Sequence, residues 1–159
     1  MILLWGILED TPMQMVYSVL TGSGTPFFFL NHRDIADTKI ILDYENGLTA
    51  KLFCNNKELD LSKVTAAYLR PYDFHDYDEF EGKKYNDPLV LQAAGVEQAL
   101  WSWAESSDAV IVNKLSASAS NQSKPYQLCL IQDAGFTIPD TLITTDPGAV
   151  MEFKHKHEK

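Results

Sequence analysis

Arg70 stands where a guanidinium group could bind an anion. It follows the apolar run 64–69 and precedes Pro71 and Asp73. A guanidinium at the carboxyl end of a strand can hold a carboxylate or a phosphate through two parallel hydrogen bonds, and the proline stiffens the turn that presents it. Asp73 could orient the arginine, so we predict that Arg70 and Asp73 contact a substrate. The alternative is that Arg70 pairs with a nearby carboxylate and only fastens the loop.

Lys124 is a second candidate for anion binding. It stands at the amino end of the helix predicted over residues 123–134, where a cation faces the positive end of the helix dipole at a cost on the order of a few tenths of a kcal/mol. A bound anion would offset this cost, because free backbone N–H groups and a lysine together form a phosphate site. The alternative is an exposed lysine whose long stem holds its charge away from the dipole.

No pattern in the sequence predicts a metal site. The stretch after Arg70 combines a histidine with acids: His75, Asp76, Asp78, Glu79 and Glu81. Their spacing matches no specific ligand motif, which favours a solvated loop. The same interpretation holds for His155 and His157 in the polar tail.

Short apolar runs predict the parallel strands that position these residues. The first run, residues 1–8, lacks a basic leader and is closed by Glu9 and Asp10, so it is predicted as a buried strand and not as a signal peptide. Thr11 can cap a helix that has Pro12 at its first position and that ends at the glycines of 22–24. A second apolar run, residues 25–30, is then expected to return parallel to the first strand.

The middle of the chain combines a hairpin with the remaining parallel strands. Alternation over 39–61, with tight-turn signals at 46–47 and 55–56, predicts an inserted antiparallel hairpin. Two further strands are expected at 64–69 and at 109–112, the latter buried. Between them, a helix capped by Asp87 and begun by Pro88 should turn one face to the core. The residues of that face are Leu89, Ala93, Val96, Leu100 and Trp103.

The predicted fold is α/β, with a Rossmann-like, mostly parallel sheet, helices on both of its faces and an inserted β-hairpin. After the helix at 123–134, which Gly135 ends, residues 141–144 are expected to be extended, and Asp146 and Pro147 begin a last helix. In open α/β sheets, ligands bind at the carboxyl ends of the strands. This places candidate sites at 9–11, which includes the substrate-contact candidate Asp10, at 70–74 and at 113–124.

Composition excludes several functional classes. The 159 residues carry a net charge of −9 without a basic block, which argues against binding to nucleic acid or to an anionic membrane surface. The cysteines, Cys54 and Cys129, lie far apart in sequence, and we expect reduced thiols in a soluble, cytoplasmic chain. No glycine-rich phosphate loop follows the first strand, so a nicotinamide dinucleotide is not expected.

The order of motifs resembles the front end of ATP-grasp ligases. The motifs are the segments 68–74, 110–114, 121–126 and 134–144, the last of which reads Ala-Gly-Phe-Thr-Ile-Pro-Asp-Thr-Leu-Ile-Thr. The arrangement is similar to prokaryotic glutathione synthetase, to the ribosomal-protein glutamate ligases and to the ligases of microviridin-type peptides. It implies a pre-ATP-grasp domain over residues 1–119 and a truncated helix-strand-helix start of the ATP-grasp fold over residues 120–159.

The resemblance also implies roles for particular residues. In such ligases the arginine matching Arg70 faces the substrate cleft, and the lysine matching Lys124 lies at the edge of the nucleotide site. The family continues with a second lysine, a glycine-rich lid and magnesium ligands, whereas this sequence stops at Lys159. ATP and Mg²⁺ are therefore expected in a complete ligase and not bound tightly by this chain alone.

Two functions follow as hypotheses. The first is the substrate-binding portion of a ligase that phosphorylates a carboxylate and joins it to an amine or hydroxyl, with a small acid or a peptide as substrate and no catalytic residue of its own here. The second is a stand-alone module that binds such a ligand and catalyses nothing. The sequence does not identify the substrate. It also leaves the oligomeric state open, with a homo-oligomer among the alternatives.

Overall fold

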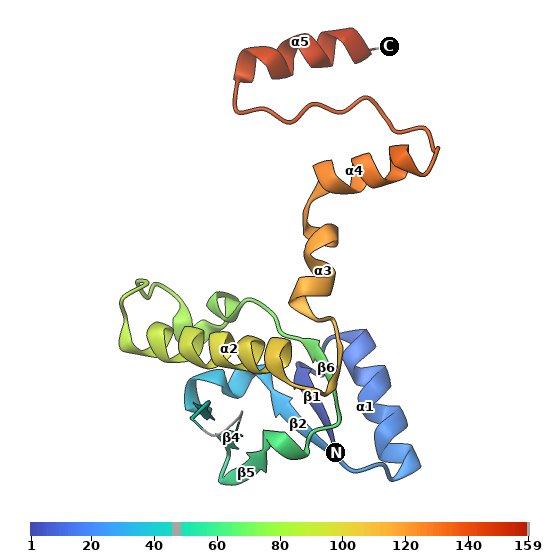
Figure 1. Cartoon of the computed structure of the whole chain (residues 1–159). Coiled ribbons are helices and arrows are strands. Elements are labelled where there is room, and N and C mark those ends of the chain that lie inside the picture. Colours follow the sequence, from blue (N-terminus) through green and yellow to red (C-terminus); the bar gives the residue numbers. More distant parts are fainter. Residues whose placement is uncertain (46–48, 159) are drawn as a thin grey trace. The chain divides into compact units, whose positions relative to one another are not determined.

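The computed structural model describes residues 1–45 and 49–158, with the backbone alone for 119–122 (Figure 1). The chain divides into two compact units, Met1–Ser118 and Ala119–Lys159. The first unit contains both sheets and the two longest helices. It also contains most of the residues considered for binding.

The first unit is built on a four-stranded parallel sheet. Its strands are β1 (Ile2–Gly6), β2 (Phe27–Asn31), β6 (Ala66–Arg70) and β7 (Val110–Val112), in the order β2-β1-β6-β7. Leu3, Leu4 and Trp5 of the central strand are fully buried, as expected for a strand covered on both faces. The predicted α/β fold with a parallel sheet is confirmed.

Helix α1 (Thr11–Ser23) connects the first two strands, and its cap differs from the prediction. The N-cap is Asp10, whose carboxylate accepts a hydrogen bond from the backbone N–H of Met13, so the prediction of Thr11 as the cap is wrong. An aspartate accepts this bond as readily as a threonine, and here it precedes the proline by one more residue. Gly24 ends the helix in the left-handed conformation, with φ of 66°.

The predicted hairpin is a separate antiparallel sheet of three strands. They are β3 (Lys39–Asp43), β4 (Thr49–Cys54) and β5 (Lys57–Asp60). Asn55 and Asn56 join the last two strands with φ of 50° and 59°, a turn conformation that asparagine tolerates. The turn predicted at 46–47 falls at residues 46–48, outside the described residues. Ala50, Leu52 and Leu59 are buried in the core.

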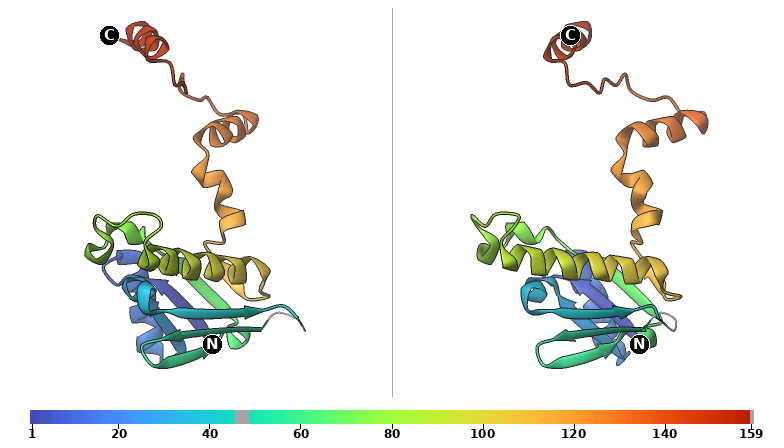
Figure 2. Two further views of the ribbon diagram at one scale, coloured as in Figure 1. Left: turned by 90° about the vertical axis from the view of Figure 1, so that its left-hand side faces the viewer. Right: turned by 60° about the vertical axis from the view of Figure 1, so that its left-hand side comes forward.

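Helix α2 (Pro88–Ser106) packs against the core through the predicted stripe. Ala93, Val96, Leu100 and Trp103 are buried, while Leu89 is only partly buried and its neighbour Val90 takes the inward position. Helices α1 and α2 lie on opposite faces of the parallel sheet (Figure 2). The sheet is thus covered on both faces, as predicted.

Strand β7 lies at an edge of the sheet, which corrects one prediction. Residues 109–112 were expected to form a buried strand, but Val110 and Val112 are 68% and 49% exposed. The strand pairs with β6 alone among the described strands. An apolar run predicts a strand but does not tell a central position from an edge.

The second unit consists of helices and connecting segments. A helix that the sequence did not predict, α3 (Leu115–Gln122), spans the boundary between the two units and is followed by α4 (Lys124–Asp133) and α5 (Pro147–His157). Ser123 and Asp146 cap the latter two helices, both of which begin where the sequence predicted a helix. Residues 141–144, which were expected to be extended, lie outside the helices and strands of the structure, and that expectation stays a prediction. None of the described helices is long and apolar enough to cross a membrane.

Candidate functional site

Asp10 and Arg70 meet at the carboxyl edge of the parallel sheet. Arg70 donates from Nε to Oδ2 of Asp10 at 2.7 Å and from Nη2 to Oδ1 at 3.0 Å. Asp10 is 6% exposed and the arginine side chain 36%. The hydroxyl of Tyr72 donates to the same carboxylate at 3.3 Å. Asp10, and not Asp73, is therefore the residue that orients Arg70.

These contacts keep Asp10 ionised. The hydrogen bond from Arg70 is the largest cause that lowers the pKa of Asp10, and the backbone N–H of Met13 and the Tyr72 hydroxyl act in the same direction against burial. The same bond raises the pKa of Arg70. Gly6, the last residue of β1, lets the backbone of β1 lie close to Arg70 and Met13. A Cβ at this position would lie 2.8 Å from the carbonyl oxygen of Arg70 and 2.8 Å from Cε of Met13.

Asp73 belongs to the loop that follows β6. Its Oδ1 accepts hydrogen bonds from the backbone N–H of His75 at 3.0 Å and contacts Nδ1 of the same histidine at 2.8 Å. The backbone bond is the largest cause that lowers the pKa of Asp73. Asp73 thus caps the short helix η3 (Phe74–Asp76), while two-thirds of its side chain stays exposed. Its predicted contact with a substrate stays a prediction.

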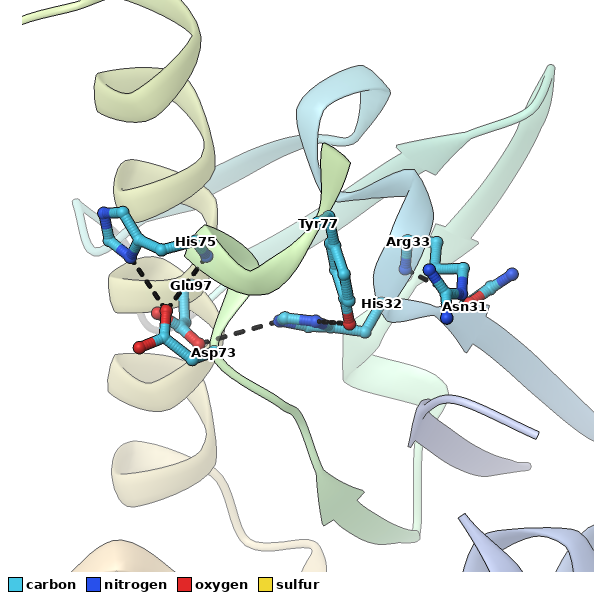
Figure 3. A network of polar contacts seen from close by, with 7 residues as sticks. All are labelled: Asn31, His32, Arg33, Asp73, His75, Tyr77 and Glu97. Carbon is cyan, nitrogen blue, oxygen red and sulfur yellow. Dashed lines mark hydrogen bonds and ion pairs between the residues drawn. The ribbon is translucent and has the colours of Figure 1, made fainter. Parts of the chain in front are cut away.

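A buried histidine joins β2, the loop and helix α2. His32 is fully buried, its Nδ1 lies 2.7 Å from the hydroxyl of Tyr77, and its Nε2 lies 3.7 Å from Oε1 of Glu97 (Figure 3). Burial raises the pKa of Tyr77 to about 12, so this hydroxyl stays protonated. The contact holds the aromatic ring of Tyr77 at a fixed position behind the sheet edge.

Arg33 lies at the same edge and was not singled out from the sequence. Its Nε donates to Oε1 of Glu9 at 3.1 Å, and its guanidinium carbon lies 4.9 Å from the centre of the Tyr77 ring. The signal that identified Arg70 also applies here, since Arg33 follows the predicted strand 25–30 within a few residues. The intervening Asn31 and His32 obscured it.

Comparison with known proteins supports the fold. No protein-family model matches the sequence, and no curated protein matches it significantly. Solved structures do match. The macrocyclase MdnC of Microcystis aeruginosa MRC, bound with the precursor peptide MdnA, superposes with a TM-score of 0.78 at 16% identity, over 98% of this chain and 51% of MdnC. The chain therefore has an α/β fold similar to that of about half of MdnC.

Further ligases of this fold give the same result. A RiPP-associated ATP-grasp ligase of Chryseobacterium gregarium, in complex with ADP and a leader and core peptide, has a TM-score of 0.73 at 22% identity, over 98% of this chain and 47% of the ligase. The ATP-grasp ligase PsnB, complexed with a minimal precursor, Mg and ADP, has 0.65 at 23%, over 98% and 51%. The chain therefore spans about half the length of the ligases that it matches.

In this ligase-like fold, Lys124 belongs to the second unit. It is the first residue of α4, its side chain is exposed, and its Nζ donates to Oε1 of Gln127 at 3.1 Å. Ser123 caps the helix, and its hydroxyl accepts from the backbone N–H of Tyr126. This geometry is that of an ordinary capped helix. The predicted role of Lys124 at a nucleotide site stays a prediction.

Asn113 and the histidines complete the set of residues considered from the sequence. Asn113 follows β7 with φ of 69°, and its Nδ2 donates to the carbonyl of Leu69 at 3.0 Å, which ties two strand ends together. His155 and His157 contact Glu158 and Asp140 respectively. Within the described part of the chain, no group of three or more His, Cys, Asp or Glu side chains could hold a metal ion.

Proposed function

We propose that this chain is the N-terminal, peptide-binding portion of an ATP-dependent ligase. The observation that carries the proposal is the likeness over 98% of the chain to MdnC and to the Chryseobacterium ligase, both of which were solved with peptides bound. Identities of 16% and 22% support a shared fold and leave the substrate open.

The chemistry proposed for the complete ligase is condensation through an acyl phosphate. A carboxylate oxygen of the substrate attacks the γ-phosphorus of ATP, which releases ADP and gives a mixed anhydride. An amine or hydroxyl then attacks the carbonyl carbon, loses its proton and expels inorganic phosphate. Mg²⁺ would neutralise the charge of the transferred phosphoryl group. PsnB was solved with Mg and ADP, and we assign nucleotide binding to the half of such ligases that has no counterpart in this chain.

Within this chain, the proposed peptide site is the carboxyl edge of the parallel sheet. Polar side chains from the ends of β1, β2 and β6 gather there, including Asp10, Arg33, Arg70 and Tyr72. Ligands of open α/β folds bind at this edge because the loops that leave the strands converge on it. Asp73 lies on one of these loops, so it stays part of the proposal.

Peptide binding by the whole chain tests the proposal. Fluorescently labelled peptides from the short reading frames beside the gene are titrated with the chain, and anisotropy is followed against scrambled peptides of equal composition. Saturable binding of one peptide, at least tenfold tighter than its scrambled form, is expected. Equal binding of native and scrambled peptides would remove the proposed function.

The assignment of the nucleotide to the other half of the ligases has its own test. Calorimetry of the chain with magnesium-ATP should show no binding in the micromolar range, because the residues proposed to clamp the phosphates are not in this chain. Micromolar binding, lost in Lys124→Ala, would move the nucleotide site into the second unit. The variant Lys156→Ala is the matched control, since it removes an exposed lysine from another helix of that unit.

A further inference from the structure

Three contacts, one of the backbone and two of the side chain, hold Arg33 in place. The backbone N–H of Arg33 donates to Oδ1 of Asn31 at 3.2 Å, which caps the short helix η1 (His32–Asp37). Its guanidinium lies against the Tyr77 ring (Figure 3), and its Nε donates to Oε1 of Glu9. The terminal nitrogens of the guanidinium make no hydrogen bond to any other described residue. A long surface side chain is therefore oriented while two of its donor groups remain unused.

The Tyr77 ring on which Arg33 stacks is itself held in place. Tyr77 is 8% exposed, and its hydroxyl lies 2.7 Å from the buried ring of His32. A guanidinium stacked on an aromatic face keeps its plane fixed, so less side-chain entropy is lost when its remaining N–H groups form hydrogen bonds. Preorganisation of this kind increases affinity without additional contacts.

The two arginines at the sheet edge differ in how much of their bonding capacity is used. Arg70 is joined by two hydrogen bonds to Asp10, which is 6% exposed, so this pair is part of the fold. Arg33 makes a single bond to Glu9, and the side chains of this pair are 49% and 61% exposed. An exposed ion pair contributes little to stability and exchanges readily with solvent or with another anion. Glu9 can therefore leave Arg33 without unfolding the edge.

We propose that Arg33 is a binding residue for a carboxylate of the substrate, and that Glu9 occupies its place when no substrate is bound. A carboxylate matches the planar fork of donors that a guanidinium presents. The inference rests on the proposed function, because the carboxylate would belong to an acidic side chain of the bound peptide. Arg33 would thereby select peptides with an acidic residue.

The position of Arg33 agrees with this role. Asn31 on β2 and Arg70 on β6 both pair with Gly6 of β1, so their Cα atoms lie about 10 Å apart across the sheet edge. Arg33 follows Asn31 by two residues. An extended peptide that crosses the carboxyl ends of β2, β1 and β6 could contact both arginines. A peptide carboxylate at Arg33 would then lie beside the proposed contact at Arg70.

Nuclear magnetic resonance can test the proposal with a small probe. The sequence contains two arginines, Arg33 and Arg70, so their Nε–H resonances can be assigned from one Arg33→Lys variant. The probe is N-acetyl-L-glutamic acid α-amide, and N-acetyl-L-glutamine amide is its uncharged control. The Arg33 resonance is expected to move saturably with the acid only. Equal movement with both probes, or movement of Arg70 alone, would overturn the proposal.

Variants separate binding by Arg33 from general electrostatics. Arg33→Gln should lower the affinity for the acid probe about tenfold or more, because it removes a charge-assisted pair. Lys39→Gln, which removes an exposed positive charge elsewhere in the first unit, should leave the affinity unchanged. Glu9→Gln should increase the affinity for the acid probe about two- to fivefold, since it removes the competing carboxylate. Equal weakening by the two charge-removing variants, or unchanged affinity in Glu9→Gln, would contradict the proposal.

The labelled peptides then distinguish this inference from the proposed function. If the native peptide binds wild type and Arg33→Gln equally, Arg33 is not the recognition residue and peptide binding stands. If no peptide binds the wild-type chain better than its scrambled form, the proposed function fails, whatever the small probe shows. Unchanged melting temperatures of the variants confirm that any loss of affinity reflects binding and not unfolding.

Discussion

Asp10 and Arg70 are separated by 60 positions in the sequence and joined by two hydrogen bonds in the structure. The same carboxylate caps helix α1 through the backbone N–H of Met13. One acidic side chain thus fastens β6 to the start of the helix that leaves β1. The ends of two neighbouring strands are fixed relative to each other at the edge where we place the peptide.

Arg70→Ala should lower stability. It would leave the carboxylate of Asp10 buried with fewer donors, and breaking a pair of this kind costs roughly 2–4 kcal/mol when one partner is partly exposed. The urea midpoint of the variant is the measurement. A midpoint equal to that of the wild type, together with weakened peptide binding, would instead show that Arg70 acts on the substrate alone.

The pH dependence of stability should report the Asp10 carboxylate. Its pKa in the folded state is lowered below the usual value near 3.8, chiefly by Arg70. A group of this kind stabilises the fold above its unfolded pKa, and the stabilisation is lost as the pH falls through the folded pKa. Asp10→Asn should therefore be less stable than wild type at pH 7, and the difference should shrink below about pH 4.

Urea denaturation of both proteins between pH 7 and pH 3 checks this prediction. Comparison with Asp10→Asn is needed because the pKa values of Asp60 and Asp73 are also lowered, so the wild-type curve alone combines several groups. Asp73→Asn, in which an exposed capping carboxylate is lost, is the control and should show a smaller difference. A constant gap between wild type and Asp10→Asn at all pH values would contradict the assignment.

The core face of α2 can be tested with two leucines of the same helix. Leu100 is 1% exposed, and Leu100→Ala should cost on the order of 2–5 kcal/mol because it leaves a cavity in the core. Leu91 is 58% exposed, so Leu91→Ala should change the free energy of unfolding by less than about 0.5 kcal/mol. Chemical denaturation of both variants gives the comparison. Similar losses would mean that the inward face is wrongly assigned.

Local signals predicted most of the fold. The apolar runs at β1, β2 and β6 and the Asp-Pro starts of α2 and α5 depend on neighbouring residues, which the sequence displays directly. Helix α3 was missed because its sequence, Leu-Ser-Ala-Ser-Ala-Ser-Asn-Gln, has no apolar stripe and is rich in residues that favour caps and turns. The exposure of Val110 was missed because an apolar strand at an edge reads like a central one.

The site was predictable only in part, because its contacts are long-range. Arg70, Asp10 and Asp73 were all identified as candidates at the carboxyl edge, but Asp73 was predicted to orient Arg70, whereas the structure pairs Arg70 with Asp10, 60 positions away. The contact between His32 and Tyr77 spans 45 positions, and nothing local marks it. Arg33 depends on that contact, so its orientation follows from the tertiary structure and not from its neighbours.

Substituting alanine at Gly6 and at Gly95 should have opposite effects on stability. At Gly6, a Cβ would meet the backbone oxygen of Arg70 at 2.8 Å, and a backbone atom of a central strand cannot move away without disturbing the sheet. Gly6→Ala should therefore destabilise the protein by about 1–3 kcal/mol. At Gly95, in the middle of α2, a Cβ would meet no atom within 4 Å. Gly95→Ala should stabilise by up to about 1 kcal/mol, because alanine loses less backbone entropy in a helix.

Thermal denaturation of both glycine variants decides whether the close approach at Gly6 is real. A lower melting temperature for Gly6→Ala and a higher one for Gly95→Ala are expected. The proposed peptide site offers a second readout, since Asn31 and Arg70 each pair with Gly6, on its two sides in the sheet. Displacement of the Arg70 backbone should shift the Arg70 Nε–H resonance in Gly6→Ala, whereas Gly95→Ala should leave it in place. Unchanged stability and an unchanged Arg70 resonance in Gly6→Ala would show that β1 and β6 tolerate a side chain between them.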